Sequence, residues 1–275
     1  MKILALVLLL AQVDAAATAT PTATPEATPA PLEKPVLFRG TCTPGGGPSG
    51  CRVFAVGFVT DAGIEAFPCT TAIENESRNR IAARYFLPGT ELDLYLRGAP
   101  TGVFTVVKED EPSRGCGNRA EGRRRGAPGH TYSFIALHPD DPVKLAAVRY
   151  PMGVQPPPQA IAVAALAGET SGGATASDIK VRDHRRLRDG DTSILVIEAI
   201  AGSMNAVVIA EGDGPDASKW KIVWTDLAKS GKANLEIADS FDLGADGTPE
   251  ILFERVHRGE PSEWVLLRRS AGAWK

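Results

Sequence analysis

The distribution of apolar residues divides the first half of the chain into short segments with the spacing of β-strands. Between residues 35 and 150, runs rich in β-branched and aromatic side chains alternate with Gly-, Pro- and Asp-containing turn signals, and in 91–96 apolar and polar residues alternate strictly. Strict alternation places one face of a strand in a core and the other in solvent. These patterns indicate a small β-barrel or β-sandwich. The predicted strands are 35–38, 52–60, 64–67, 81–86, 91–96, 102–107 and 132–137.

The second half has the same character, with tighter turns between the apolar runs. Asp-Gly pairs at 189–190, 213–214 and 246–247 separate β-rich segments, which is a strong short-range signal for hairpins. A short alanine-rich helix is predicted at 159–166. The predicted strands of this antiparallel meander are 179–187, 193–201, 205–211, 219–226, 233–243, 250–255 and 263–269.

Two stretches of the meander contain the same sequence features in the same order. An Asp-Gly turn at Asp189 is followed by two apolar strands and Trp220, and the same order recurs from Asp246 to Trp274. The period of about 54 to 57 residues lies near that of propeller blades. Because two units cannot close a ring, we predict two related units that form an incomplete propeller or a sandwich and pack on each other or on the first region. Chance similarity between Gly-rich hairpins is the alternative.

Proline and glycine mark the boundaries of the predicted parts. Residues 150–158 contain four prolines, which fix φ and remove backbone donors, so neither a helix nor an interior strand can run through them. The predicted organisation is a signal peptide (1–15), a Thr/Ala/Pro-rich disordered tether (16–34), a cysteine-containing β-domain (35–150), a Pro/Gly-rich hinge with a short helix (151–177) and the β-meander domain (178–275).

The first residues predict export. Lys2 precedes the apolar run 3–11, and a small-x-small sequence ends at Ala15, as in a secretory signal peptide. The run is about half the length of roughly 20 residues that spans a bilayer, and no later stretch approaches it, so no transmembrane segment is predicted. We expect a periplasmic or extracellular protein. The formal net charge of −3 argues against a nucleic-acid partner.

All four cysteines, Cys42, Cys51, Cys69 and Cys116, lie in the first region. In an oxidising compartment an even number of cysteines predicts disulfides, here two, with three connectivities possible. Pairing Cys42 with Cys51 closes a Gly/Pro-rich loop and leaves Cys69 with Cys116. A zinc site is disfavoured, because no two cysteines lie two to four residues apart.

The most specific site signal lies at 241–254. Asp242, Asp246 and Glu250 occupy the first, fifth and ninth positions of a loop whose sixth residue is glycine, and such carboxylates suit calcium. The segment resembles the acidic loop of integrin-alpha-type (FG-GAP-like) repeats of secreted bacterial proteins, and this resemblance implies calcium bound by these three residues. The third position is Gly244, which offers no side-chain ligand, and a plain hairpin turn accounts for the same residues.

No catalytic arrangement is recognisable. His130, His138, His184 and His257 have no partner at ligand spacing, and Ser203 lacks the second glycine of a nucleophile elbow. We interpret the chain as a non-enzymatic secreted or cell-surface binding or structural module. The alternative is a cell-envelope hydrolase whose site is assembled only in three dimensions.

Two groups of arginines suggest the chemistry of a partner. One lies in the glycine-rich segment 114–126, which is expected to be a loop, and the other at 182–188. Either could contact the acidic groups of an anionic extracellular polymer, and a protein partner is the other possibility. Solvated loop charge is the alternative. Trp220 and Trp274 are expected in the core.

Overall fold

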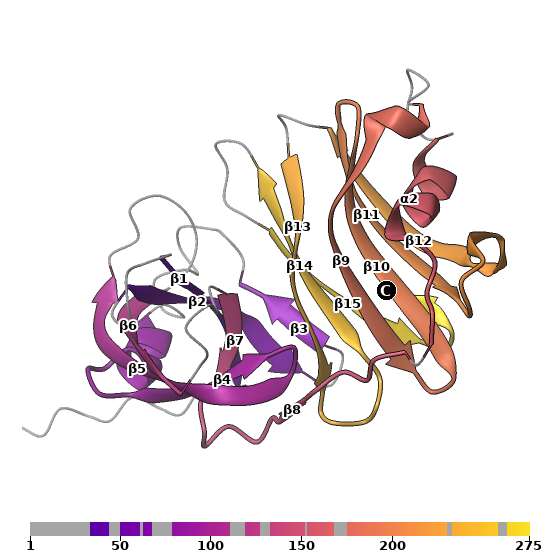
Figure 1. Ribbon diagram of the computed structural model, residues 1–275. Helices are drawn as coiled ribbons and strands as arrows, with labels where there is room; N and C mark the ends of the chain where they lie inside the picture. Colours follow the sequence, from indigo (N-terminus) through magenta and orange to yellow (C-terminus); the bar gives the residue numbers. More distant parts are fainter. Residues whose placement is uncertain are drawn as a thin grey trace, which may run out of the picture.

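In the computed structural model the first part of the chain forms a closed six-stranded antiparallel barrel (Figure 1). The order around it is β1-β7-β4-β5-β6-β2, and pairing of β1 with β2 closes the ring, while β3 extends β2 outside it. The strands are β1 (Val36–Cys42), β2 (Cys51–Thr60), β3 (Gly63–Ala66), β4 (Glu91–Leu96), β5 (Ala99–Asp110), β6 (Arg119–Arg125) and β7 (Ser133–Leu137). The structure describes residues 34–43, 50–60, 63–67, 79–110, 119–126, 133–151, 153–167, 175–229, 233–257 and 263–275.

The interior of the barrel is filled by aromatic side chains. Phe38, Phe104 and Phe134 are completely buried. A Cβ atom at Gly40 would lie 1.8 Å from the ring of Phe134, so only glycine leaves room for that ring. The interior is therefore a packed core.

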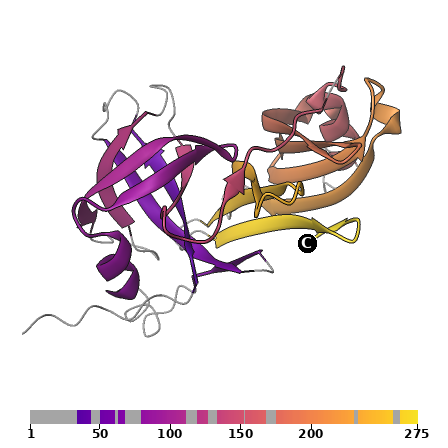
Figure 2. The same cartoon turned by 90° about the horizontal axis from the view of Figure 1, so that it is seen from below.

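Residues 79–85 form a helix that lies against one end of the barrel (Figure 2). The strand predicted at 81–86 is therefore wrong. Ile81 and Tyr85 are both buried in the barrel core, and a spacing of four residues puts them on one face of a helix. Because the segment is short, the spacing of its apolar residues fits the two-residue period of a strand as well as the 3.6-residue period of a helix.

A second correction concerns the first arginine group. Residues 119–125 are strand β6 and not part of a loop. Ala120 and Gly122 are buried, whereas Arg123 and Arg125 are exposed, so the strand alternates between core and solvent without any large apolar side chain. A strand of this composition has no run of large apolar residues, so the hydrophobic pattern of the sequence did not predict it.

The second part of the chain consists of two further antiparallel sheets. One has the order β12-β11-β10-β9 and the other β16-β15-β14-β13-β8. The strands are β8 (Leu145–Ala146), β9 (Ile179–Asp189), β10 (Thr192–Ala201), β11 (Met204–Gly212), β12 (Lys221–Lys229), β13 (Ala233–Leu243), β14 (Glu250–His257), β15 (Glu263–Ser270) and β16 (Ala273–Trp274). The helices are α2 (Pro158–Leu166), which confirms the helix predicted at 159–166, and the short 3-10 segments η2 (Ala176–Asp178) and η3 (Ala217–Lys219).

These elements are stacked in layers. Figure 1 shows the barrel, the sheet β13–β15, the sheet β9–β12 and helix α2 in that order across the molecule. One buried cluster, with Ile194 and Phe253, lies between the two sheets, and a second, with Ile161 and Leu195, lies between β9–β12 and α2. Strand β10 is therefore buried on both faces, which explains its nearly continuous apolar sequence.

Each sheet contains a meander of four consecutive strands. Trp220 and Trp274 are both buried, as expected for core residues. Trp220 packs in the cluster beneath α2, whereas Trp274 packs between the sheets. The relatedness of the two units stays a prediction.

The outer face of β13–β15 packs against the outside of the barrel. Leu37 and Ile135 of the barrel share a buried cluster with Phe241 and Leu252 of the sheet. At the edge of this interface Arg39 forms an ion pair with Glu254 and lies over the ring of Trp264, 5.1 Å from its centroid. The barrel thus covers the face that the sandwich would otherwise expose.

The segment after β7 is already part of the sandwich. Strand β8 pairs with Asp242 and Leu243 of β13, and the carbonyl of Arg149 accepts a hydrogen bond of 2.8 Å from the Arg188 backbone N–H. No helix in the described residues is long and apolar enough to cross a membrane. The predicted signal peptide and nearly all of the tether lie outside the described residues.

Cys42 and Cys51 form a disulfide between the last residue of β1 and the first of β2. Cys69 and Cys116 lie outside the described residues. Replacing Cys42 and Cys51 together with serine should lower the free energy of unfolding by about 2–3 kcal/mol, because the short loop between them loses its covalent closure. Urea denaturation of the oxidised proteins measures this loss. An unchanged midpoint and slope would show that this bridge contributes nothing to stability.

Candidate functional site

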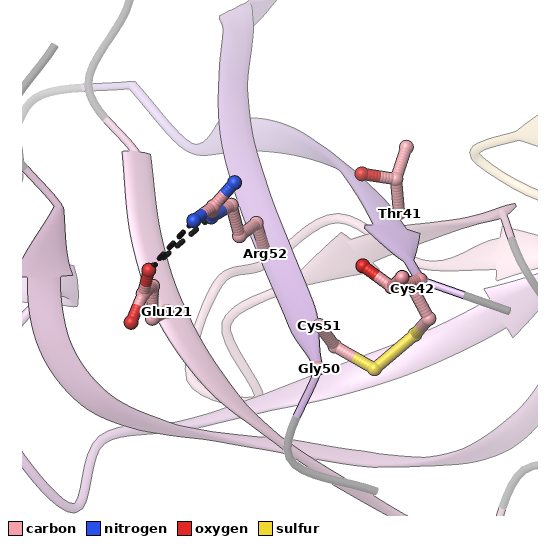
Figure 3. Close-up of a pocket in the computed structure, with 7 residues that line it drawn as sticks. Thr41, Cys42, Gly50, Cys51, Arg52 and Glu121 are labelled. Carbon is pink, nitrogen blue, oxygen red and sulfur yellow. Dashed lines mark hydrogen bonds and ion pairs between the residues drawn. A yellow bond between two sulfur atoms is a disulfide. The ribbon is translucent and has the colours of Figure 1, made fainter. Parts of the chain in front are cut away.

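A hollow opens at the end of the barrel beside the disulfide. Its volume is about 290 Å³, and Figure 3 shows the disulfide at one side and a pair of charged side chains at the other. The threonines Thr41 and Thr43 add hydroxyl groups to the lining, together with Arg52 of β2 and Glu121 of β6. Cross-strand pairing explains this composition, because Arg52 is the register partner of Glu121 and both point outward from the barrel.

The charged side of the hollow continues into an ion-pair network over β2, β5 and β6. Arg52 Nη2 lies 2.8 Å from Glu121 Oε1, and Arg52 Nε lies 3.3 Å from Asp110 Oδ2. Glu121 also faces Lys108 at 3.2 Å, and Asp110 faces Arg119 at 2.8 Å. The hydrogen bond between Arg52 and Glu121 lowers the pKa of Glu121 and raises that of Arg52. The network combines three cations with two anions, so donors and acceptors for a polar ligand lie side by side with a net positive charge.

The predicted calcium ligands meet in the loop between β13 and β14, but their oxygen atoms are already used. The Asp242 carboxylate accepts hydrogen bonds from the backbone N–H groups of Asp246 and Gly247, at 3.0 and 2.9 Å. Asp246 Oδ1 accepts one of 2.8 Å from Thr248 N–H, and its Oδ2 is bound by Arg268. The loop therefore has the self-contained hydrogen bonding of a turn.

Glu250 is fully buried at the base of this loop. Its Oε2 accepts a hydrogen bond of 2.6 Å from Leu243 N–H, and its Oε1 lies 3.1 Å from Arg268 Nε. Burial raises the pKa of Glu250 to about 8, against the opposing effects of the Leu243 N–H and the Arg268 charge. Among the described residues no group of three or more His, Cys, Asp or Glu side chains has the arrangement of a metal site. With a guanidinium between two of its three carboxylates, the loop does not fit calcium.

A second set of polar residues, here called the junction cluster, lies where the barrel meets the sandwich. It consists of Arg97 from the turn between β4 and β5, Tyr150, Asp183 and Arg185 of β9, and Asp239 of β13. Asp239 is 4 % exposed, and its carboxylate accepts hydrogen bonds from the N–H groups of Arg97 at 3.3 Å and Ser240 at 2.8 Å.

The charges of the junction cluster partly balance one another. Arg185 is bound by both oxygens of Asp183, at 2.7 and 2.6 Å, and the Arg97 side chain donates to the Tyr150 hydroxyl at 3.4 Å. Burial raises the pKa of Asp239 to about 6, although its hydrogen bonds and the charges of Arg185 and Arg97 oppose the rise. The cluster ties a barrel hairpin to the end of the sandwich and contains no serine, threonine, cysteine, lysine or histidine side chain.

A third polar set fixes the helix at the end of the barrel. The Asp141 carboxylate lies 3.0 Å from Arg84 and accepts hydrogen bonds of 3.4 Å from the Tyr85 hydroxyl. The His138 ring packs edge-on against Tyr85, with ring centroids 5.5 Å apart. Burial raises the pKa values of both Tyr85 and Asp141. Because Tyr85 and Asp141 are almost completely buried, this set holds the helix against the residues after β7.

The remaining candidate residues are not brought together. His184 lies on β9, His257 is the last residue of β14 and Ser203 lies in the turn between β10 and β11, while His130 and Arg114 fall outside the described residues. Among the described residues no histidine hydrogen-bonds to a hydroxyl or thiol group.

Most arginines of the two groups are held by carboxylates of the fold. Arg119 and Arg125 bind Asp110 and Glu91. On β9, Arg182 lies 3.6 Å from Glu198, Arg185 binds Asp183 and Arg188 binds Asp191. Arg123 and Arg186 are exposed.

The pattern of the sequence missed Arg268, Arg97 and Asp239. Arg268 is the cross-strand partner of Glu250, so aligning β14 with β15 would have found it. Asp239 is one of three acids in β13, and nothing in the local pattern distinguishes it as the one that meets Arg97. Comparison of the chain with family models, with curated proteins and with solved structures finds no match.

Proposed function

We propose that the protein is an exported, non-enzymatic binding module, and that it binds acidic, hydroxyl-rich extracellular polymers at the hollow beside the Cys42–Cys51 disulfide. The observation that carries the proposal is the arrangement of Arg52 and Glu121 at this hollow. A half-exposed guanidinium next to a carboxylate and two threonine hydroxyls offers donors and acceptors to a chain of hydroxyl and carboxylate groups.

The other polar sets support a binding or structural role by their position. The junction cluster, the Tyr85–Asp141 set and the Arg268 loop each join different elements of the fold, and their acids are buried or bound by arginine. These groups hold the layers in place. At the hollow, in contrast, the Arg52 side chain is 51 % exposed.

Binding of an anionic polymer tests the proposal. Isothermal titration with polygalacturonate should give an affinity that weakens about 10- to 150-fold in Arg52→Ala, because a charge-assisted hydrogen bond contributes about 1.5–3 kcal/mol. Glu121→Gln should bind more tightly, since it removes a negative charge and releases Arg52. Arg186→Ala, which changes an exposed arginine of β9, is the matched control and should bind as the wild type does.

The outcomes separate this role from its alternatives. Equal affinities for the wild type and Arg52→Ala would remove the hollow as the site. Release of new reducing ends from the polymer during incubation would instead favour the cell-envelope hydrolase.

A further inference from the structure

Strands β5 and β6, where they pair along residues 103–110 of β5, lie on the side of the barrel away from the sandwich (Figure 1). The buried cluster that joins the barrel to the sandwich takes its barrel residues from β1, β2, β4 and β7, and in the described part of the chain it includes none from β5 or β6. Strands β2, β5 and β6 together carry six cationic side chains against three acids, although the formal net charge of the whole chain is −3. The sandwich therefore leaves a positively charged barrel face uncovered.

Arg123 is a cation of this face whose charge no acid of the described residues neutralises. Its side chain is exposed and forms no ion pair with them, whereas the next outward arginine, Arg125, binds Glu91 at 3.4 Å. Residues of β6 alternate between core and solvent, so Arg123 points to the same side as Glu121, two positions before it. Because Glu121 lines the hollow, Arg123 is the next outward position along β6 from the hollow.

Two residues of β5 complete the surroundings of Arg123. Thr105 is its register partner, so a hydroxyl group lies beside a guanidinium, as it does at the hollow. The pairing of β5 with β6 is interrupted by a bulge between Val106 and Lys108, and Val107, the residue inserted there, is 45 % exposed. The bulge thus presents an apolar side chain between the levels of Glu121 and Arg123.

We propose that Arg123, Thr105 and Val107 form a second subsite for the acidic polymer, so that a polymer chain bound at the hollow continues along β6. This inference rests on the function proposed above and gives the direction in which the polymer leaves the hollow. Arg52 pairs with Glu121 on the neighbouring strand, so the backbone positions of Arg52 and Arg123 are about 8 Å apart. A single sugar acid has one carboxylate for these two guanidinium groups, whereas linked sugar acids present one to each and lay the C–H groups of a ring over Val107.

Two ligands of different length test the proposal at constant ionic strength. Calorimetry measures the binding of hexagalacturonate, and NMR shifts of the Thr41 and Arg52 amides measure the binding of monomeric galacturonate at the hollow. Arg123→Ala should weaken hexagalacturonate binding about tenfold, because one charge-assisted hydrogen bond at an exposed position is lost. The same variant should leave the galacturonate affinity unchanged, because a single sugar acid bound at the hollow makes no contact with Arg123.

Arg186→Ala is again the matched control, because Arg186 is an exposed arginine on a strand of the sandwich, and it should bind both ligands as the wild type does. Hexagalacturonate binding that is weakened in Arg52→Ala but unchanged in Arg123→Ala would overturn the second subsite and leave the hollow in place. Equal weakening of both ligands in Arg123→Ala would also overturn it, since the arginine would then act only through the overall charge. Wild-type affinities of Arg52→Ala for both ligands would overturn the proposed function, and the second subsite with it.

Discussion

Replacing Gly98 with alanine is expected to destabilise the protein by about 3–5 kcal/mol and to loosen the barrel from the sandwich. Gly98 has φ +74°, a conformation that costs an alanine about 1–2 kcal/mol. A Cβ at this position would also lie 1.7 Å from the carbonyl oxygen of Ala146 in β8. Because that neighbour is backbone, the β4–β5 turn must move away, and the Arg97 N–H then leaves Asp239. Chemical denaturation measures the loss.

Gly272 provides a matched control for this prediction. The turn between β15 and β16 has the same geometry, with Ala271 at φ +50° and Gly272 at φ +79°, against φ +53° and +74° at Arg97 and Gly98. A Cβ on Gly272 meets nothing within 4 Å, so Gly272→Ala should show only the backbone cost. Limited proteolysis should cut the 138–157 connection faster in Gly98→Ala alone. Equal destabilisation by the two substitutions would show that the contact with Ala146 contributes nothing to docking.

How far the sequence determined this fold depends on the signal that each segment carries. The alternation of 91–96 identified this strand, although its outer face is only partly solvated because Tyr95 is buried against the sandwich. The buried strand β10 was found from its apolar content and its flanking turns. Strand β6 was missed because glycine and alanine form its inner face. The segment 81–86 was misassigned as a strand because its short apolar run also fits a strand, although two of its buried residues, four positions apart, fit a helix.

The candidate sites were harder to predict from the sequence than the strands, because their residues contact partners that are distant in the chain. The spacing of Asp242, Asp246 and Glu250 suggested calcium ligands, and in the fold these acids lie around the β13–β14 connection with Arg268 beside Asp246 and Glu250. The identity of the cation was not predictable from the loop, because Arg268 comes from the next hairpin strand. Asp239 meets Arg97 across 142 positions of the chain, and no local pattern indicates such a contact.

The Asp239 carboxylate should make the stability of the protein depend on pH. The ordinary pKa of an aspartate is about 3.8 and burial raises that of Asp239 to about 6, so the folded state binds the proton more tightly than the unfolded state. The stabilisation from protonation is therefore fully present below about pH 4 and is lost as pH rises through about 6. One pKa unit corresponds to about 1.4 kcal/mol, so the loss amounts to about 3 kcal/mol by pH 8.

Asp239→Asn isolates this contribution from the other buried acids, Asp141, Glu198 and Glu250, whose pKa values burial also raises. The amide keeps an oxygen for the N–H groups of Arg97 and Ser240 but carries no charge to titrate. Urea denaturation should therefore give equal stabilities for the wild type and Asp239→Asn at pH 4, and should show the variant to be more stable by about 3 kcal/mol at pH 8. The opposite sign at pH 8 would mean that Arg97 and Arg185 stabilise the ionised carboxylate more than burial penalises it, and the junction cluster would then be a favourable ion-pair network.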